Sequence, residues 1–343
     1  MAKREVSVNL KKALIPVAIL VVIVLLALVL LARQNLSEIL RTLQNANGLF
    51  VALAVGVYVF NIALWATRWK IAISATGHNA GLRSLFLAIW GSVFVNNLTP
   101  FTYSGGDPFA RTYFLKKLTQ TPYPSGFAAI TGEFLLDLPV FLSLMVAGLL
   151  LSFRWISTSI ALFLLGLWFA VVTVVLPLST RILRRRVAAG KISGFAHRIA
   201  KLFRIKTTKA KMSREVEHFY EGACRILQDK KRVLIMVLIA LMLWILVMIR
   251  FFLIFQALGY TPSIPMLMLA ATLPPFVGLI PLLPGGLGTV DAAFFFIYTG
   301  FGVPTGLAFS AILIERAITY VLGTLIGAGA LSYLGISIWM KKK

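Results

Sequence analysis

The stretch Leu279–Phe296, LIPLLPGGLGTVDAAFFF, limits how the whole chain can fold. It is very apolar, yet it carries two prolines, three glycines and the carboxylate of Asp291. Proline removes a helix donor and glycine frees the backbone, so no continuous helix is expected here. Irregular backbone at membrane depth persists only where protein or a water-filled cavity satisfies its polar groups. The stretch predicts a broken helix that restarts at an acid, as in many transporter substrate sites.

A second stretch of the same kind lies upstream, at Asn97–Phe109, NLTPFTYSGGDPF. It again combines a proline, Pro100, with a glycine pair and the acid Asp107. The two stretches belong to a wider set of matching residues at a nearly constant offset. Four pairs differ by 180 and two by 182: Gly105/Gly285, Gly106/Gly286, Pro124/Pro304, Gly126/Gly306, then Arg68/Arg250 and Gly77/Gly259. The chain therefore reads as two related halves, predicted at 49–155 and 233–340.

The composition places the 343-residue chain among integral membrane proteins, because 59% of it is hydrophobic and only 13% charged. Its 34 Lys and Arg against 11 Asp and Glu give a net charge of +23. In a soluble protein that balance would suggest nucleic acid, whereas here it fits basic loops that hold topology and meet anionic inner-leaflet lipids. One cysteine and three histidines predict no disulfide and no metal site. No cofactor motif stands out.

The hydrophobic runs predict an all-α polytopic protein with an inverted repeat. Six full crossings and two re-entrant broken-helix hairpins account for about eight hydropathy spans. Arg68, Trp69 and Lys70 are interpreted as an interface anchor at the end of the second crossing. The basic loops predict that both termini lie in the cytoplasm. The predicted crossings are 13–32, 49–69, 125–151, 156–177, 233–258 and 305–340, and the predicted hairpins are 84–115 and 265–298.

The polar segment 178–232 holds 16 Lys and Arg against four acids. Apolar residues recur in it at helical spacing, among them Val216, Phe219 and Ala223. We interpret it as one or two amphipathic helices that lie against the inner leaflet, and we expect no nucleic-acid partner. Further along, Gly323-x-x-x-Gly327 predicts close helix packing.

Charged residues within the predicted membrane region are the candidate site, because such charges are costly and are usually functional or paired. Adding 182 to the number of Glu133 gives Glu315, so these acids hold equivalent places in the halves. A purely structural alternative is internal ion pairing, for example of Asp107 with Arg111 at i, i+4. Glycine amides at the second break are candidates for binding an anion. The candidate substrate-binding residues are Asp107, Arg111, Glu133, Asp137, Arg250, Gly285, Gly286, Asp291, Glu315 and Arg316.

The stretch Leu279–Phe296 and the segment after it resemble a known family. LPGGLGTVDAAF followed by GVPTGLAFSAILIERAITYVLGTLIGAG is similar to the second signature of the lysylphosphatidylglycerol synthase transmembrane family, the flippase-like domain of multiple peptide resistance factors. NNLTPFTYSGGDPFARTYFLKK is similar to its first signature. The signature positions are Pro284, Gly285, Gly286, Gly288, Asp291 and Arg316, with Pro100, Gly106 and Arg111 in the first half. One departure is Asp291, where the family usually has glutamate.

The resemblance implies movement of a lipid between leaflets, in the plasma membrane of a prokaryotic cell. Because only three residues follow the last predicted crossing, we expect no soluble aminoacyl-transferase domain and no enzymatic activity. The predicted partner is a membrane phospholipid or lipid-linked substrate, held in a polar cavity between the hairpins. Two other classes stay open at this stage: an ion-coupled carrier of a small soluble solute and, with less support, a membrane-embedded lipid-modifying enzyme. The oligomeric state, including a homo-oligomer, is open as well.

Overall fold

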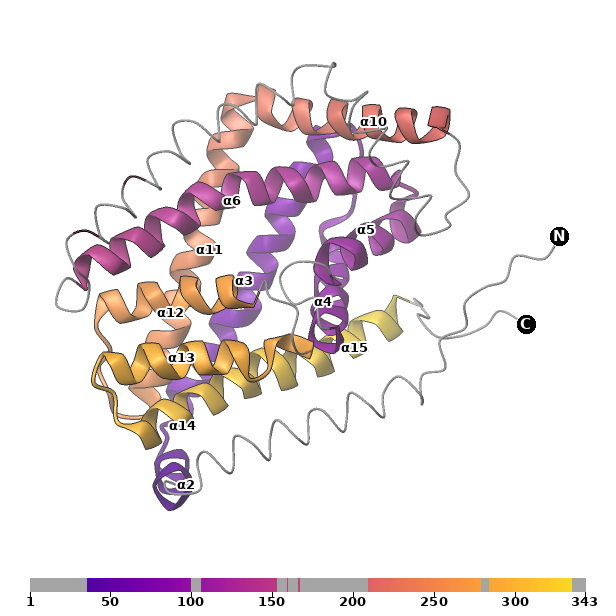
Figure 1. Ribbon diagram of the computed structural model, residues 1–343. Helices are drawn as coiled ribbons and strands as arrows, with labels where there is room; N and C mark the ends of the chain where they lie inside the picture. Colours follow the sequence, from indigo (N-terminus) through magenta and orange to yellow (C-terminus); the bar gives the residue numbers. More distant parts are fainter. Residues whose placement is uncertain are drawn as a thin grey trace.

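A computed structural model describes residues 36–99, 106–152, 209–278 and 284–334, with the single positions 159 and 166. Within these residues every regular element is a helix, as Figure 1 shows. The prediction of an all-α membrane protein is therefore confirmed. The elements are α2 (Leu36–Gln44), α3 (Gly48–Ala75), α4 (Leu82–Leu98), α5 (Gly106–Thr119), α6 (Tyr123–Leu151), α10 (Lys209–Gln228), α11 (Lys230–Ala257), α12 (Ile264–Val277), η3 (Pro284–Gly286), α13 (Thr289–Gly300), α14 (Thr305–Arg316), η4 (Ala317–Leu322) and α15 (Gly323–Tyr333).

Four helices in the described part of the chain are long and apolar enough to span a bilayer: α3, α6, α11 and the continuous run from α14 through η4 to α15. Two shorter apolar helices, α4 and α12, lie between them in sequence. The crossings predicted at 13–32 and 156–177 lie outside the described residues. The protein is thus a multi-pass membrane protein.

The two halves have matching helix boundaries. Helices α3 and α11 both have 28 residues, and adding 182 to Gly48–Ala75 gives Lys230–Ala257. The caps match too, because the Asn47 side chain accepts from the Leu49 amide and its counterpart Asp229 accepts from the amides of Lys231 and Arg232. Helix α6 and the run α14–η4–α15 are related by the same offset. The repeat is structural, with an offset of 182 residues.

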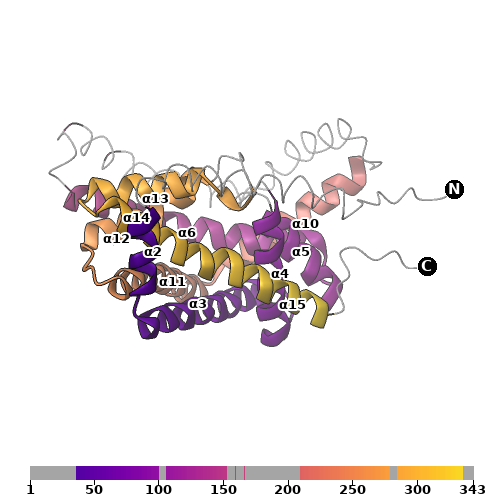
Figure 2. The same cartoon turned by 90° about the horizontal axis from the view of Figure 1, so that it is seen from below.

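The halves are inverted relative to each other, because α3 and α11 run side by side in opposite directions (Figures 1 and 2). The Asn47 amide, at the start of α3, donates to the carbonyl of Ala257 at the end of α11. Midway, the Asn61 side chain donates to the Leu243 carbonyl over 2.9 Å. Asn61 and Leu243 are themselves 182 residues apart. A local two-fold axis that relates the two halves therefore passes between these two residues. The repeat is of the inverted-topology kind.

One detail of the sequence alignment was wrong. Pro124 had been paired with Pro304, but the structure aligns Pro304 with Pro122, since these two prolines cap α14 and α6 with nearly the same backbone angles. Likewise Gly106 begins α5, whereas Gly286 lies before the first turn of α13. Pairing identical residue types gave the wrong equivalence here, because structural equivalence is defined by the position of the helix cap and not by the residue type.

Each half contains a hairpin of two short helices joined by a break. In the first half α4 packs on α5, and in the second α12 packs on α13. The two breaks touch, because the Gly285 amide donates to the Thr99 carbonyl over 3.3 Å. The predicted pair of broken-helix hairpins is confirmed, although Pro100 and Gly105 lie outside the described residues.

The last long helix is distorted where it passes the first hairpin. Residues Ala317–Leu322 form a π-helical turn, which leaves backbone carbonyls without their usual α-helical donors. The Asn97 side chain, at the end of α4, donates to the carbonyls of Thr319 and Tyr320 and to the Thr324 hydroxyl. The end of one half's broken helix thus satisfies the irregular turn of the other half.

Helix α10 is the described part of the basic segment, and it lies along α6 (Figure 1). Its inner face is buried at Tyr220, Ala223 and Ile226. Of the apolar stripe that suggested contact with lipid, Ala223 is covered by protein, whereas Val216 and Phe219 are half-buried. The rest of 178–232 before Lys209 lies outside the described residues.

Candidate functional site

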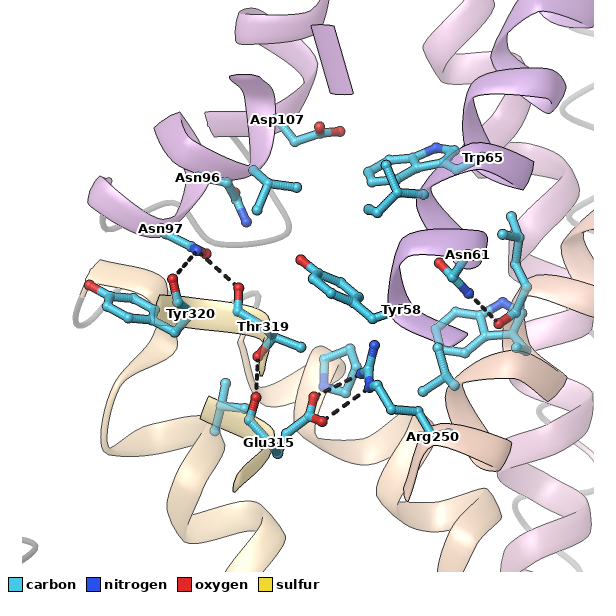
Figure 3. A pocket seen from close by; sticks show the side chains of 18 of the residues that line it. Tyr58, Asn61, Trp65, Asn96, Asn97, Asp107, Arg250, Glu315, Thr319 and Tyr320 are labelled. Atoms are coloured by element: carbon cyan, nitrogen blue, oxygen red, sulfur yellow. Dashed lines mark hydrogen bonds and ion pairs between the residues drawn. The ribbon is translucent and has the colours of Figure 1, made fainter. Parts of the chain in front are cut away.

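A cavity of about 320 Å³ lies between the two halves, next to the broken helices. Helices α3 and α11 form one wall, and the hairpins with the π-helical turn form another (Figure 3). Its volume is at the lower end of the range for ligand pockets, about 300–1,000 Å³. The cavity can therefore hold a small polar group but not a whole lipid with two acyl chains.

The polar lining of the first half is a group of five charged residues. We name Arg68, Asp107, Arg111, Glu133 and Asp137 the first-half cluster. Arg111 donates to Asp107 over 2.9 Å and to Glu133 over 2.6 Å. Arg68 donates to Asp137 over 2.6 Å and, through its other terminal nitrogen, to the Glu133 backbone carbonyl. Both guanidiniums are 1% exposed, so these are buried ion pairs.

The second half contributes four charged residues, the second-half cluster: Arg250, Asp291, Glu315 and Arg316. Arg250 donates to both carboxylate oxygens of Glu315, at 3.0 and 2.8 Å, as Figure 3 shows. Arg316 points elsewhere and donates to Asp291 over 2.5 Å. Adjacent residues on a helix point about 100° apart, which is why Glu315 and Arg316 take different partners. Arg250, Glu315 and Arg316 line the cavity directly.

Aromatic rings support one arginine of each cluster. Arg111 lies over the rings of Trp65 and Trp69, at 4.7 and 5.2 Å from their centres. Arg250 lies over the rings of Tyr58 and Phe251, at 5.3 and 5.4 Å. A guanidinium over an aromatic face is attracted by the ring quadrupole, more strongly when both are desolvated. The rings therefore help to hold these cations in a largely apolar surrounding.

Two of the glycine amides at the second break, which we expected to be available to an anion, already donate within the protein. The Gly288 amide donates to Asp291, and the Gly285 amide already donates to Thr99. Arg316 instead contacts the carbonyls of Gly285 and Gly286, at 3.2 and 3.4 Å. Asp291 lies in the first turn of α13 and already places a carboxylate at the start of that helix. It therefore occupies the position that a bound anion would take.

Eight of the ten predicted site residues line one cavity. The other two, Gly286 and Asp291, do not line it but contact Arg316, which does. The structure adds one charged residue, Arg68, that the sequence analysis had not included. Arg68 was interpreted with Trp69 as an interface anchor, but both side chains are buried, and α3 continues past them to Ala75. The available signal was the repeat, because Arg68 is the equivalent of Arg250. The sequence also missed the polar and aromatic cavity residues Tyr58, Asn61, Trp65, Asn96, Asn97, Thr319 and Tyr320.

Among the described residues, no group of three His, Cys, Asp or Glu side chains is arranged to hold a metal ion. The carboxylates of both clusters form ion pairs with guanidiniums instead. Removing one member of such a pair leaves an uncompensated buried charge, typically at a cost of about 3–5 kcal/mol. In the described part of the chain, the charged groups around the cavity are thus held as ion pairs.

Comparison with known proteins places this arrangement in a family. The family model for the lysylphosphatidylglycerol synthase TM region matches residues 14–327, which include the described parts of both hairpins and all nine charged residues of the two clusters. The chain belongs to this family. The two family signatures expected from the sequence fall on the broken hairpins and on the helix that carries Glu315 and Arg316.

Relatives of this family member occur in archaea. It is 32% identical to a UPF0104 membrane protein of Methanothermobacter thermautotrophicus over 88% of this chain and 90% of the relative. It is 26% identical to a UPF0104 membrane protein of Methanocaldococcus jannaschii, over 91% and 93%. No solved structure matches the chain. The membrane location and the prokaryotic relatives agree with the prediction, while the plasma membrane and the orientation of the termini stay predictions.

Proposed function

We propose that this protein moves a phospholipid or lipid-linked molecule between leaflets, with the headgroup in the cavity and the acyl chains in the surrounding lipid. The observation that carries the proposal is the buried, paired-charge cavity where the broken helices of two inverted halves meet. Inverted repeats with discontinuous helices at a central polar site are the architecture of alternating-access transporters. Membership of the family supports a lipid as cargo.

The cavity size favours a headgroup over a whole lipid. About 320 Å³ accommodates a phosphate with a small alcohol or amine, whereas acyl chains have to stay outside. A headgroup that carries a phosphate can replace a carboxylate on Arg111 or Arg316, because guanidinium binds both groups with the same planar fork. The displaced carboxylate is then free to bind a cationic group of the same headgroup. Exchange of partners avoids an unpaired buried charge.

Reconstituted vesicles test the proposal. The purified protein is placed in liposomes that contain phospholipids with a fluorescent acyl chain, and a membrane-impermeant reductant reports the fraction of label in the outer leaflet. We expect loss of label beyond the outer-leaflet fraction with the wild type. Val247→Trp, on the cavity wall of α11, should block it. Leu238→Trp, on the exposed side of the same helix, should not.

Two results would overturn the proposal. One is a fluorescence loss equal to that of protein-free liposomes for every headgroup offered. The other is uptake of a soluble glycerophosphate or amine, blocked by Val247→Trp, with no movement of lipid. That second result would identify a carrier of a small soluble solute. Covalent change of the lipid, detected by mass spectrometry, would instead identify an enzyme.

A further inference from the structure

The two clusters differ in charge. The second-half cluster pairs two guanidiniums with two carboxylates, while the first-half cluster sets two guanidiniums against three. Among the described residues that line the cavity there is no lysine or histidine to balance the extra acid. Taking an uncompensated charge out of water costs several kcal/mol. The first-half cluster therefore requires one more positive charge.

The source of the imbalance is Asp137. Its repeat equivalent, 182 residues on, is Thr319. In the second half the Thr319 hydroxyl donates to the Glu315 backbone carbonyl, and Arg250 is left to take both carboxylate oxygens of Glu315. In the first half Arg68 instead donates to the side chain of Asp137. The equivalent of the Arg250–Glu315 pair, between the side chains of Arg68 and Glu133, is not made.

Of the three acids in the first-half cluster, Glu133 is the one whose negative charge is least stabilised by its surroundings. Its Oε2 accepts from Arg111, but its Oε1 is buried and has no hydrogen-bond partner among the described residues, and Glu133 is 2% exposed. Asp107 has a donor on each oxygen, from Ser92 and Arg111. The Asp137 side chain is 27% exposed, so its carboxylate is only partly buried within the protein. Of the three acids, Glu133 is the one for which the neutral form is most favourable.

We propose that Glu133 is a proton-binding site, created by Asp137, which acts as a positioning residue through Arg68. The step is simple: the ionised carboxylate takes one proton on Oε1 and becomes a neutral acid. An uncharged oxygen without a partner costs about 1–3 kcal/mol, less than a net buried charge. A bound metal ion is a weaker account, since no three metal-ligating side chains converge in the described part of the chain.

Among the residues that the structure describes, the surroundings of Glu133 contain no other charge that balances the cluster. The charges that act on it are Arg68 from α3, Arg111 from α5 and Asp137 from α6 itself, with Asp107 sharing Arg111. Helix α10 meets α6 beside Glu133 through Ile226, which packs on Gly132. Helices α11 and α12 meet α6 further along, through Trp244 against Phe141 and through Met268 and Leu269 against Gly148. These contacts are apolar.

Protonation also changes what Arg111 can bind, a consequence that rests on the proposed function. A neutral Glu133 no longer competes as an anion for Arg111, which then keeps one ionised partner, Asp107. Arg111 is thereby prepared for a phosphate. Release of the proton restores the Arg111–Glu133 ion pair and displaces the phosphate. Each half then holds two guanidiniums and two carboxylates in the protonated state, and a proton would be coupled to headgroup release.

Infrared spectroscopy of the full-length protein in lipid nanodiscs tests the site without any transport assay. A neutral carboxylic acid gives a carbonyl band that shifts in heavy water and fades as pH rises. We expect this band at neutral pH in the wild type and its loss in Glu133→Gln, which mimics the neutral acid and should fold. Asp137→Thr, which copies the second half, should also abolish it. Glu217→Gln, exposed on α10, should leave it unchanged.

Absence of the band from the wild type at neutral pH would overturn the proposal, and so would its persistence in Glu133→Gln. Persistence in Asp137→Thr with loss in Glu133→Gln would overturn the role of Asp137. In the vesicle assay Glu133→Gln should lose the pH dependence of lipid movement. If no lipid moves while the band behaves as expected, the proton site stands and the proposed function fails.

Discussion

Asn61 donates its side-chain amide to the carbonyl of Leu243, the residue that occupies its own place in the other half. A contact between repeat equivalents on antiparallel helices marks the point about which the two halves are related. Both residues line the cavity, so the site lies at the symmetry point of the fold. In the proposed function, the halves exchange roles as the cavity opens to one side or the other, which is the logic of alternating access.

Arg316 is expected to be required for lipid movement. Arg316→Ala should abolish it and also destabilise the protein by about 3–5 kcal/mol, because Asp291 is left buried and unpaired. Arg316→Lys should restore it only in part, since one ammonium cannot reach Asp291 and both glycine carbonyls as the fork does. The vesicle assay and thermal unfolding in nanodiscs measure both effects.

A double variant separates folding from function in that experiment. Arg316→Gln combined with Asp291→Asn removes both charges, so most of the lost stability should return while lipid movement stays absent. Arg214→Ala, at an exposed arginine of α10, serves as the control. Lipid movement at the wild-type rate by the double variant would contradict a role for Arg316 in transport.

The contact between the two breaks is expected to depend on Gly285. A Cβ there would lie 2.3 Å from the Tyr320 ring, and the φ of +63° is strained for any side chain. Gly259 has a similar φ, +73°, but open space around it. Gly259→Ala should therefore cost only the backbone strain, about 1–2 kcal/mol. Gly285→Ala should cost about 1–3 kcal/mol more through overpacking. Equal melting temperatures for the two variants would show that the break is not tightly packed.

The packing of α15 on α4 is expected to require Gly327. A Cβ at Gly327 would lie 2.4 Å from the Trp90 carbonyl oxygen, whereas one at Gly329 meets nothing within 4 Å. Gly327→Ala should lower the thermal unfolding midpoint, because two helix backbones have to separate. Gly329→Ala should leave it unchanged or raise it, since alanine is the better helix former. A lower midpoint for Gly329→Ala alone would refute this account.

The orientation can be tested by cysteine labelling in a Cys224→Ser background. Basic segments favour the cytoplasm, so Thr261→Cys, after α11, should react with an impermeant reagent in intact cells. Ala210→Cys, at the start of α10, should react only after permeabilisation. Both positions are exposed. Reaction of Ala210→Cys from outside would reverse the predicted topology.

The sequence by itself determined the class of fold and the ingredients of the site. Long apolar runs make membrane helices wherever they occur, and proline and glycine break a helix by local geometry alone. The repeated acids and arginines were visible because the halves share one offset, and Glu133 and Glu315 occupy equivalent places on matching helices. These properties depend on local sequence and spacing, so they can be predicted without coordinates.

Only the tertiary structure decided which charges pair between different helices. Arg68 and Arg250 are repeat equivalents, yet Arg250 binds Glu315 and Arg68 binds Asp137. The acids Asp107 and Asp291 receive arginines from different elements, Arg111 on α5 and Arg316 on α14. An ion pair forms within about 4 Å, a distance set by the rotation and crossing of helices far apart in sequence. The extra carboxylate of the first half comes from the sequence, at Asp137, but its pairing with Arg68 follows from those rotations.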